Sequence, residues 1–373
     1  MNPPKTVHIA LGSNQGDRLS FLQKAVDNLH ERVGDIAAVS KVYETPAWGF
    51  EGSAFLNSCV AVHTRMEPEV VLQELLKIET SLGRERSAGK GYQSRTIDLD
   101  ILLFEEEIRA SESLKLPHPE LQRRKFVLFP LADVAAEVVH PVLKKKIKEL
   151  LQEAEDPSEI SVFPEGIKKP EGFDFSKFSY IAVEGNIGAG KTSFATMVSQ
   201  DYNAKLILER FKDNPFLPKF YEDQPRYAFS LEMSFLADRY QQLSDDIAQY
   251  DLFTDFVISD YDVFKSLIFA KITLQEDEYS LYHKLFNIMY KELVKPDLYI
   301  YLYQNTERLL ANIKKRGRDY EQNIQQEYLA DINKSYLSFI KSQPSLNVKI
   351  IDISELDFVN DRRDYLKLLR EIV

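Results

Sequence analysis

VEGNIGAGKT, residues 183–192, is the most specific short motif in the chain. From Gly185 to Thr192 it fits the pattern G-x-x-x-x-G-K-[ST], and it stands between an apolar run and a helical pattern, as a phosphate-binding loop requires. In such a loop the backbone N–H groups approach phosphate oxygens, the Lys191 ammonium reaches the outer phosphates and the Thr192 hydroxyl can bind Mg²⁺. The motif therefore predicts that ATP binds Gly185, Asn186, Ile187, Gly188, Ala189, Gly190, Lys191 and Thr192.

Apolar runs alternate with long helical patterns in the second half of the chain. They cover residues 180–183, 205–208, 256–259, 298–303 and 348–351. Strands without polar alternation are typical of a parallel sheet that is covered by helices on both faces. The pattern predicts an α/β domain of three layers, with a parallel five-stranded sheet, over residues 178–373.

The first half of the chain mixes strand and helix patterns at unequal spacing. Strands are predicted over residues 7–11, 37–43, 55–63 and 97–104, and helices over 19–33 and from Pro68 onward. This order favours an α+β sandwich of the ferredoxin-like type, formed by residues 1–155, over a doubly wound sheet. Residues 156–177 are rich in proline, glycine and charge, so we interpret them as a linker.

The overall composition narrows the class of partner. A net charge of −11 over 373 residues disfavours a nucleic-acid polymer, because phosphate neutralisation needs a basic surface. No stretch reaches 18 consecutive apolar residues, and the N-terminus lacks the apolar segment of a secretory signal. Cys59 is the only cysteine, which excludes an intramolecular disulfide. We expect a cytoplasmic protein that binds small molecules and neither nucleic acid nor membrane.

Several charged residues of the second half are candidates for an acceptor site. Glu209 and Asp260 follow predicted strands, at the sheet edge where ligands bind, and a carboxylate there can take a proton from a hydroxyl. Glu232 lies beside the apolar stripe of a predicted helix, and Arg316 and Arg318 belong to a basic cluster that could close over a transferred phosphoryl group. The alternative for each is a solvated charge at a strand end or on a helix face.

Two aspartates stand out in TIDLDILLF, residues 96–104. The segment alternates with period two, so Asp98 and Asp100 share one face of a strand, roughly 7 Å apart. A pair of Mg²⁺ ions bridged by ATP oxygens would suit two such carboxylates. The alternative is the exposed polar face of an edge strand.

Basic residues flank this strand. Arg84, Arg86, Lys90 and Arg95 lie in a loop of small and flexible residues, as a mobile phosphate clamp would. His118 stands between two prolines, and near the following basic residues it could meet a triphosphate; the alternative is an ordinary turn histidine.

Residues 178–373 resemble the deoxynucleoside kinase family, whose fold is an α/β P-loop kinase. The resemblance is carried by VEGNIGAGKT (183–192), ERFKDNPFL (209–217), FYEDQPRYAF (220–229), EMSFLADRY (232–240) and RGRDYEQ (316–322). DNPFL (213–217) and DYDVFKSLIFA (260–270) look most similar to the bacterial deoxyguanosine/deoxyadenosine kinase branch.

This resemblance implies roles for individual residues. Glu209 would activate the 5′-hydroxyl, with Arg239 near it and near the base, and the domain would form a homodimer. Tyr221 and Glu321 would hold the 3′-hydroxyl, Asp260 would keep an acidic role, and Arg316 and Arg318 would be lid arginines.

The chain departs from many relatives at two places. They carry an acid-Arg-Ser triplet where this chain has Asp260, Tyr261 and Asp262, and Gln where it has Glu232. A carboxylate only accepts hydrogen bonds, and guanine offers two adjacent donors. We therefore expect deoxyguanosine to be favoured.

The first half resembles hydroxymethyldihydropterin pyrophosphokinase. The phrases are ALGSN (10–14), ETPAWG (44–49), FLNSCVAV (55–62), IETSLGR (78–84), SRTIDLDILLF (94–104) and LPHPELQRRKFVLFPL (116–131). The resemblance implies diphosphate transfer from ATP to the hydroxymethyl group of the pterin, as in folate biosynthesis. Asp98 and Asp100 would bind two Mg²⁺, and Arg84, Arg95 and His118 would contact ATP. The pterin slot would be formed by Thr45, Pro46, Asn57 and Phe126, with Arg124 at its edge.

Together the motifs predict a bifunctional enzyme with two ATP sites, two Mg²⁺ ions in the first domain and one in the second. One alternative for the second domain is a nucleoside-monophosphate kinase, which needs arginines for the acceptor phosphate that residues 260–262 lack. Another is a nucleotide sensor without turnover, against which Lys191, Glu209, Arg316 and Arg318 argue.

Overall fold

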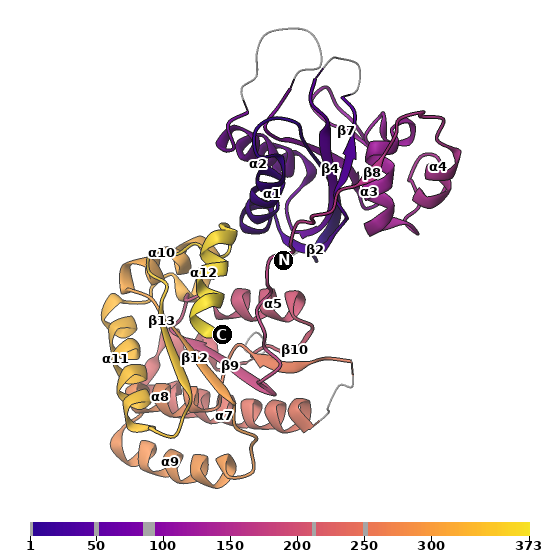
Figure 1. Cartoon of the computed structure of the whole chain (residues 1–373). Helices are drawn as coiled ribbons and strands as arrows, with labels where there is room; N and C mark the ends of the chain where they lie inside the picture. The colour runs from indigo at the N-terminus through magenta and orange to yellow at the C-terminus, as the bar shows by residue number, and fades with distance from the viewer. Residues whose placement is uncertain (1–2, 48–51, 85–93, 211–213, 249–252) are drawn as a thin grey trace. The chain divides into compact units, whose positions relative to one another are not determined.

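The computed structural model of the chain describes residues 3–47, 52–84, 94–210, 214–248 and 253–373. The chain divides into two compact units, the first ending at Gly172 and the second comprising Phe173–Val373 (Figure 1). None of the helices in these described ranges is long and apolar enough to span a membrane.

The first unit is built on an antiparallel sheet with the strand order β5-β1-β4-β3-β8, and β2 also pairs with β4. Its strands are β1 (Lys5–Ser13), β2 (Asp35–Val39), β3 (Tyr43–Thr45), β4 (Phe55–Thr64), β5 (Asp98–Phe104) and β8 (Ser161–Val162). A small hairpin adds β6 (Arg109–Ala110) and β7 (Lys115–Leu116). This arrangement confirms the predicted α+β class.

Helices cover both faces of this sheet. On one face lie α1 (Arg18–Arg32) and α2 (Pro68–Ser81), packed on β1 residues such as Ile9. On the other lie α3 (Lys125–Ala135) and α4 (Ile147–Glu153), packed on Cys59 and Leu102. Because side chains alternate along a strand, the sheet contributes to two apolar cores.

The strand predicted over residues 37–43 is two strands. Ser40 separates β2 from β3: its Oγ lies 3.0 Å from Ser58 Oγ and accepts a hydrogen bond from the backbone N of Cys59 at 2.9 Å. The backbone N of Cys59 thus donates to a serine side chain and not to a carbonyl of the neighbouring strand, a kind of contact that serine often makes. Both short strands still pair with β4.

Residues 156–177, interpreted from composition as a linker, contain apolar side chains that pack on both sides of the division. Phe163 and Ile167 pack against the core of the first unit, and β8 pairs with β3. Phe173 and Phe175 pack in a core of the second unit. The division between the units falls between these two pairs of side chains.

The second unit has a parallel sheet with the order β10-β11-β9-β12-β13, which confirms the predicted five strands. The strands are β9 (Tyr180–Gly185), β10 (Ala204–Ile207), β11 (Phe256–Ser259), β12 (Leu298–Tyr303) and β13 (Val348–Asp352). The helices are α5 (Lys191–Asp201), α6 (Leu217–Glu222), α7 (Gln224–Ala248), α8 (Phe264–Thr273), α9 (Glu276–Tyr290), α10 (Thr306–Arg316), α11 (Gln326–Ser342) and α12 (Arg362–Ile372).

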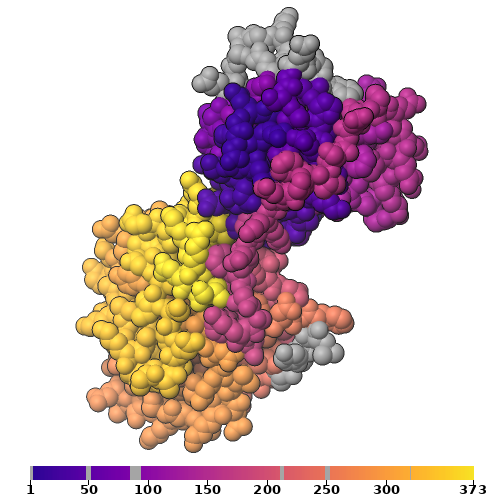
Figure 2. All heavy atoms as spheres, viewed as in Figure 1, coloured from indigo at the N-terminus to yellow at the C-terminus, as the bar shows by residue number. Residues whose placement is uncertain are grey.

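Alternate residues of the central strand β9 enter different cores. Tyr180 and Ala182 pack with α7, α8, α9 and α11, whereas Ile181 and Val183 pack with α5 and α12. The sheet is therefore the middle of three layers, and α12 (yellow) lies on the surface of the unit (Figure 2). Strand order reverses around β9, and ligands of open α/β sheets bind beyond the carboxyl ends of the strands at such a point.

Candidate active sites

The loop between β9 and α5 depends on glycine. Gly190 has a φ of +83°, and a Cβ added there would lie 2.8 Å from Cζ of Phe358. Asn186 fixes the loop to α11, because its Nδ2 donates to the Leu329 carbonyl and to Asn333 Oδ1, each at 2.8 Å. The first turn of α5 offers its free N–H groups and the positive end of its dipole to an anion in this loop.

The side chain of Lys191 folds back onto the same loop. Its Nζ donates to the carbonyl oxygens of Gly185 at 2.8 Å and Asn186 at 2.9 Å. Burial, followed by the nearby ammonium of Lys265, lowers the pKa of Lys191 to about 8. A bound phosphate would favour the charged form of this lysine.

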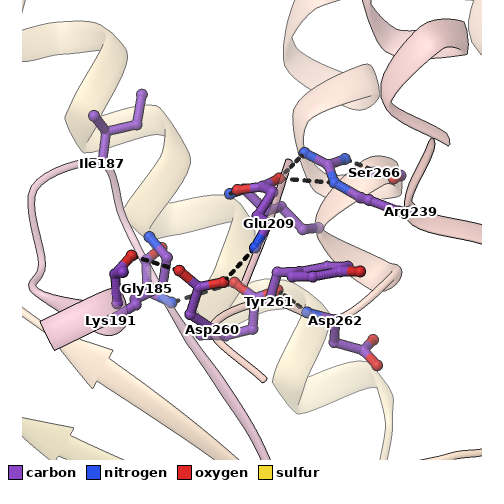
Figure 3. A network of polar contacts seen from close by, with 12 residues as sticks. Gly185, Ile187, Lys191, Glu209, Arg239, Asp260, Tyr261, Asp262 and Ser266 are labelled. Carbon is purple, nitrogen blue, oxygen red and sulfur yellow. Dashed lines mark hydrogen bonds and ion pairs between the residues drawn. The ribbon is translucent and has the colours of Figure 1, made fainter. Parts of the chain in front are cut away.

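Asp260 connects the phosphate loop to Glu209 (Figure 3). One carboxylate oxygen accepts a hydrogen bond from the Thr192 hydroxyl, and the other accepts one from the backbone N of Glu209 at 2.7 Å. Asp260 follows β11 and Glu209 follows β10, so both lie at the carboxyl edge of the sheet. The motif residue Thr192 and the candidate base are thus held by one buried carboxylate.

Glu209 is held by two cations. Its Oε1 accepts from Arg239 Nε at 2.9 Å and Nη2 at 2.6 Å, and its Oε2 accepts from Lys265 Nζ at 2.6 Å. Burial raises the pKa of Glu209, but Lys265 and Arg239 lower it further, so it lies well below its usual range. Arg239 also donates to Ser266 Oγ at 2.7 Å, as Figure 3 shows. The carboxylate is therefore ionised and fixed in orientation.

A cavity lined by both apolar and charged side chains opens beside Glu209. Glu232 lies in it, 3% exposed, with Oε1 accepting from the Thr273 hydroxyl at 3.1 Å. Burial raises the pKa of Glu232 to about 7. The remaining lining includes Ile187, Leu217, Phe220, Tyr221, Leu231, Phe235, Arg239, Asp260, Lys265, Phe269, Arg316, Arg318, Glu321 and Tyr328. The predicted acceptor residues of the second half therefore share one cavity.

The basic cluster at the end of α10 contacts an acid. Arg316 and Arg318 both donate to the carboxylate of Glu321, Arg318 at 3.1 Å. Glu321 is buried and lines the acceptor cavity together with both arginines. The three charges thus stand at the cavity as one ion-paired group.

A second cavity runs from the phosphate loop to residues that the sequence analysis missed. It is lined by the loop, by Arg308 and Asn312 of α10, and by residues 356–360, which follow β13. The two cavities share Gly188, Lys191, Thr192, Glu209, Asp260, Arg316 and Arg318. Their junction therefore brings the phosphate loop, the candidate base and the basic cluster together. No motif in residues 356–360 marks them in the sequence.

One cavity of the first unit collects most of the residues predicted there. Its lining includes Thr45, Pro46, Asn57, Arg95, Asp98, Asp100, His118, Arg124 and Phe126. Asn57 Nδ2 donates to Thr45 Oγ1 at 2.8 Å, which fixes two neighbouring polar groups on the wall. Phe55, which the sequence analysis did not single out, also lines this cavity.

The two aspartates of β5 differ in their partners. Asp98 accepts hydrogen bonds from both Arg84 and Arg95. Asp100 is exposed to solvent in the cavity. The surrounding protein nevertheless displaces part of its hydration, and this effect, followed by the negative charges of Asp98 and Glu79, raises its pKa to about 7. Divalent cations beside this pair would relieve the repulsion, and carboxylate oxygens are the ligands that Mg²⁺ prefers.

Glu79, near the end of α2, is a second residue that sequence reasoning missed. It is 2% exposed, and its Oε1 accepts from the backbone N of Leu99 at 2.9 Å and from Arg84. It therefore ties Arg84 to the strand that carries both aspartates. Arg86 and Lys90, also predicted for the clamp, lie outside the described residues.

His118 is held in one tautomer. The backbone N of Glu120 donates to its Nδ1 at 3.2 Å, which leaves the ring proton on Nε2. Burial, followed by the charge of Arg124, lowers the pKa of His118. Its backbone N donates to the Leu102 carbonyl at 2.9 Å, so β5 positions the turn.

Comparison with known proteins matches each half of the chain to a different family. The profile of the deoxynucleoside kinase family matches residues 181–373, and that of 7,8-dihydro-6-hydroxymethylpterin-pyrophosphokinase matches residues 8–136. Deoxyguanosine kinase of Bacillus subtilis (strain 168) is 38% identical over 197 residues, which cover 52% of this chain and 95% of that protein. The 2-amino-4-hydroxy-6-hydroxymethyldihydropteridine pyrophosphokinase of Aquifex aeolicus (strain VF5) is 40% identical over 149 residues, 40% of this chain and 91% of that protein.

A solved structure, deoxyadenosine kinase from M. mycoides with products dCMP and a flexible dCDP bound, is 27% identical with a TM-score of 0.45, covering 52% of this chain and 100% of that one. The family profiles and the two enzymes similar to the separate halves identify the chain. It belongs to both families, and is a bifunctional ATP-dependent enzyme that joins a hydroxymethyldihydropterin pyrophosphokinase to a deoxynucleoside kinase.

Proposed function

We propose that the kinase half phosphorylates deoxyguanosine in preference to the other deoxynucleosides. The observation that carries this proposal is the buried carboxylate of Glu232 in the acceptor cavity. An ionised carboxylate accepts two hydrogen bonds, which suits the N1–H and 2-amino donors of guanine. Similarity to the deoxyguanosine kinase of Bacillus subtilis supports the same preference.

In the proposed reaction Glu209 accepts the proton of the 5′-hydroxyl. The hydroxyl oxygen bonds to the γ-phosphorus of ATP, the bond from that phosphorus to the β-bridging oxygen breaks, and ADP leaves. Lys191, Arg316 and Arg318 stand at the junction of the cavities, where they would stabilise charge on the transferred group. One Mg²⁺, held with the help of Thr192, would neutralise phosphate charge.

The rest of the acceptor cavity positions the nucleoside. Tyr221 and Glu321 would hold the 3′-hydroxyl, and Arg239 would lie between the nucleobase and Glu209. Asp260 fixes the backbone of Glu209. The second cavity, past Arg308 and residues 356–360, would take the adenine of ATP. The homodimer expected from the family resemblance stays a prediction.

In the first half we propose that the pterin occupies the cavity between Asn57 and Phe126, with Thr45, Pro46 and Arg124 around it. The pterin hydroxyl oxygen bonds to the β-phosphorus of ATP and its proton passes to solvent. The bond from that phosphorus to the oxygen shared with the α-phosphorus breaks, and AMP leaves. Two Mg²⁺ held by Asp98 and Asp100 would polarise the phosphates. Arg84, Arg95 and His118 would orient the triphosphate.

The nucleoside assignment is tested by ATP-dependent phosphorylation of the four natural deoxynucleosides with the full-length protein. The largest kcat/KM is expected for deoxyguanosine. A larger value for another deoxynucleoside would remove the guanine assignment and leave the kinase activity standing.

The base preference is also expected to depend on pH. The pKa of Glu232 is raised to about 7, so the side chain is a carboxylic acid below this pH and a carboxylate above it. The acid offers one donor and one acceptor, which suits adenine, whereas the carboxylate suits guanine. Between pH 6 and pH 8 the ionised fraction rises from roughly a tenth to roughly nine tenths. The kcat/KM ratio of deoxyguanosine to deoxyadenosine should therefore rise by up to about a hundredfold, about tenfold from each substrate.

Glu232→Gln is expected to lower this ratio and make it independent of pH, because an amide keeps one donor and one acceptor. Asp238→Asn, an exposed acid on the same helix α7, is the matched control and should behave as wild type. If Glu232→Gln leaves both the ratio and its pH dependence unchanged, Glu232 does not select the base.

A further inference from the structure

The kinase half contains a buried lysine to which neither motif nor resemblance assigns a role. Lys265 is 8% exposed, lines the acceptor cavity and places Nζ 2.6 Å from Oε2 of Glu209. Burying an ammonium is costly unless it is paired and hydrogen-bonded. Among the described residues, Glu209 is the one polar group that its ammonium contacts, so the pair belongs to the reaction centre.

The position of Lys265 within its helix does not favour helix stability. It is the second residue of α8, whose first turn carries the positive end of the helix dipole, where a cation is unfavourable. The turn before it is fixed, because Glu184 Oε1 accepts from the Asp262 backbone N at 2.7 Å and Asp262 Oδ1 accepts from the Phe264 backbone N at 2.9 Å. The chain thus holds a cation where local structure alone would disfavour one.

Lys265 also supplies charge that the preceding segment lacks. Asp260, Tyr261 and Asp262 include no basic residue, although they follow β11 at the edge nearest the phosphate loop. The side chain of Tyr261 is fully buried, and that of Asp262 is 2% exposed. The positive charge that contacts Oε2 of Glu209 therefore comes from α8 and not from residues 260–262.

The charged groups around Glu209 come from every side of the cavity. The cations are Arg239 from α7, Lys265 from α8, Lys191 from the phosphate loop, Arg316 at the end of α10 and Arg318 just after it. The acids are Glu232, Asp260 and Glu321, and the phenols are Tyr221, Tyr261 and Tyr328. Only Arg239 and Lys265 are bonded to the Glu209 carboxylate in the described contacts, one on each oxygen.

We propose that Lys265 is a positioning residue, which keeps Glu209 ionised and orients Oε2 toward the acceptor hydroxyl while Arg239 holds Oε1. This inference rests on the proposed role of Glu209 as the base. Lys265 acts through that carboxylate, so its removal changes how readily Glu209 gains a proton. Removing an opposite charge in contact with a carboxyl group raises its pKa by about 1–3 units.

The test measures kcat of deoxynucleoside phosphorylation for Lys265→Gln and Lys265→Met from pH 9 down to the lowest pH at which each protein stays folded. A base must be deprotonated, so activity falls as the pH falls through its pKa. The part of the pH profile in which kcat falls on acidification is its acid limb. In wild type this limb lies at low pH, because two cations hold Glu209 ionised. In both neutral variants it should move up by about 1–3 pH units, so kcat should begin to fall on acidification at a pH about 1–3 units higher than in wild type, with wild-type-like kcat toward pH 9.

Controls separate this effect from misfolding and from failure of the base assignment. Lys265→Arg should restore the wild-type profile, and Lys271→Met, at an exposed lysine of the same helix, should not change it. The glutamine variant keeps a hydrogen-bond donor and tests the proposal should the methionine variant not fold. A folded neutral variant with an unshifted limb, or a loss equal at every pH, would overturn the proposal. Turnover retained by Glu209→Gln would instead overturn the base role itself.

Discussion

Asp100→Asn is expected to reduce diphosphate transfer to the pterin on the order of 10³-fold and to leave deoxynucleoside phosphorylation at the wild-type rate. Asp100 shares one face of β5 with Asp98, and both line the cavity of the first unit. Each metal ion that polarises a phosphoryl group contributes several kcal/mol, and about 4 kcal/mol corresponds to 10³-fold. The neutral amide would weaken cation binding at this position.

The measurement is AMP release with the pterin as acceptor, over a Mg²⁺ titration. Asp100→Asn should need more Mg²⁺ and should remain slow when Mg²⁺ saturates. Glu106→Gln, at an exposed acid just beyond β5, is the matched control. Diphosphate transfer within a few-fold of wild type in Asp100→Asn would show that this carboxylate holds no catalytic cation.

Glu209→Gln is expected to remove deoxynucleoside phosphorylation by a factor on the order of 10²–10⁴, the range that general base catalysis contributes. The amide cannot take the proton of the 5′-hydroxyl. ATP binding should persist, because the phosphate loop is anchored through Asn186 to α11 and not through Glu209. AMP release by the first unit should also persist.

Glu209→Gln leaves Arg239 and Lys265 without their carboxylate, so a lower melting temperature is expected as well. ATP affinity measured on the same sample separates lost chemistry from lost fold. Glu276→Gln, an exposed acid in the first turn of α9, is the control. Wild-type turnover by Glu209→Gln would require a different proton acceptor.

Residues that signal their structure locally were predictable from the sequence. The apolar runs of the second half became the five parallel strands, because a strand buried on both faces has no polar alternation. The period-two pattern of residues 96–104 likewise placed Ile97, Leu99 and Ile101 in the core and Asp98 and Asp100 on the other face. In both cases the hydrophobic pattern of residues adjacent in the sequence is enough to predict the strand and its buried face.

Contacts between distant residues were not predictable in this way. Lys265 reaches Glu209 across 56 positions, and in the sequence it resembles any lysine of an amphipathic helix. Glu79 contacts Leu99 across 20 positions, and its burial follows from the packing of α2 on β5. Ser40 interrupts a strand through a contact with Ser58 on β4. Each depends on which elements meet in the fold.

The most direct test of two separate phosphotransfer sites in one chain is to identify the nucleotide that ATP becomes with each acceptor. The full-length protein is incubated with ATP and either 6-hydroxymethyl-7,8-dihydropterin or deoxyguanosine, and AMP and ADP are separated. The two activities predict AMP with the pterin, ADP with the nucleoside, and both at additive rates when the acceptors are combined. Formation of only one product, or suppression of one product by the other acceptor at saturating ATP, would contradict two independent sites.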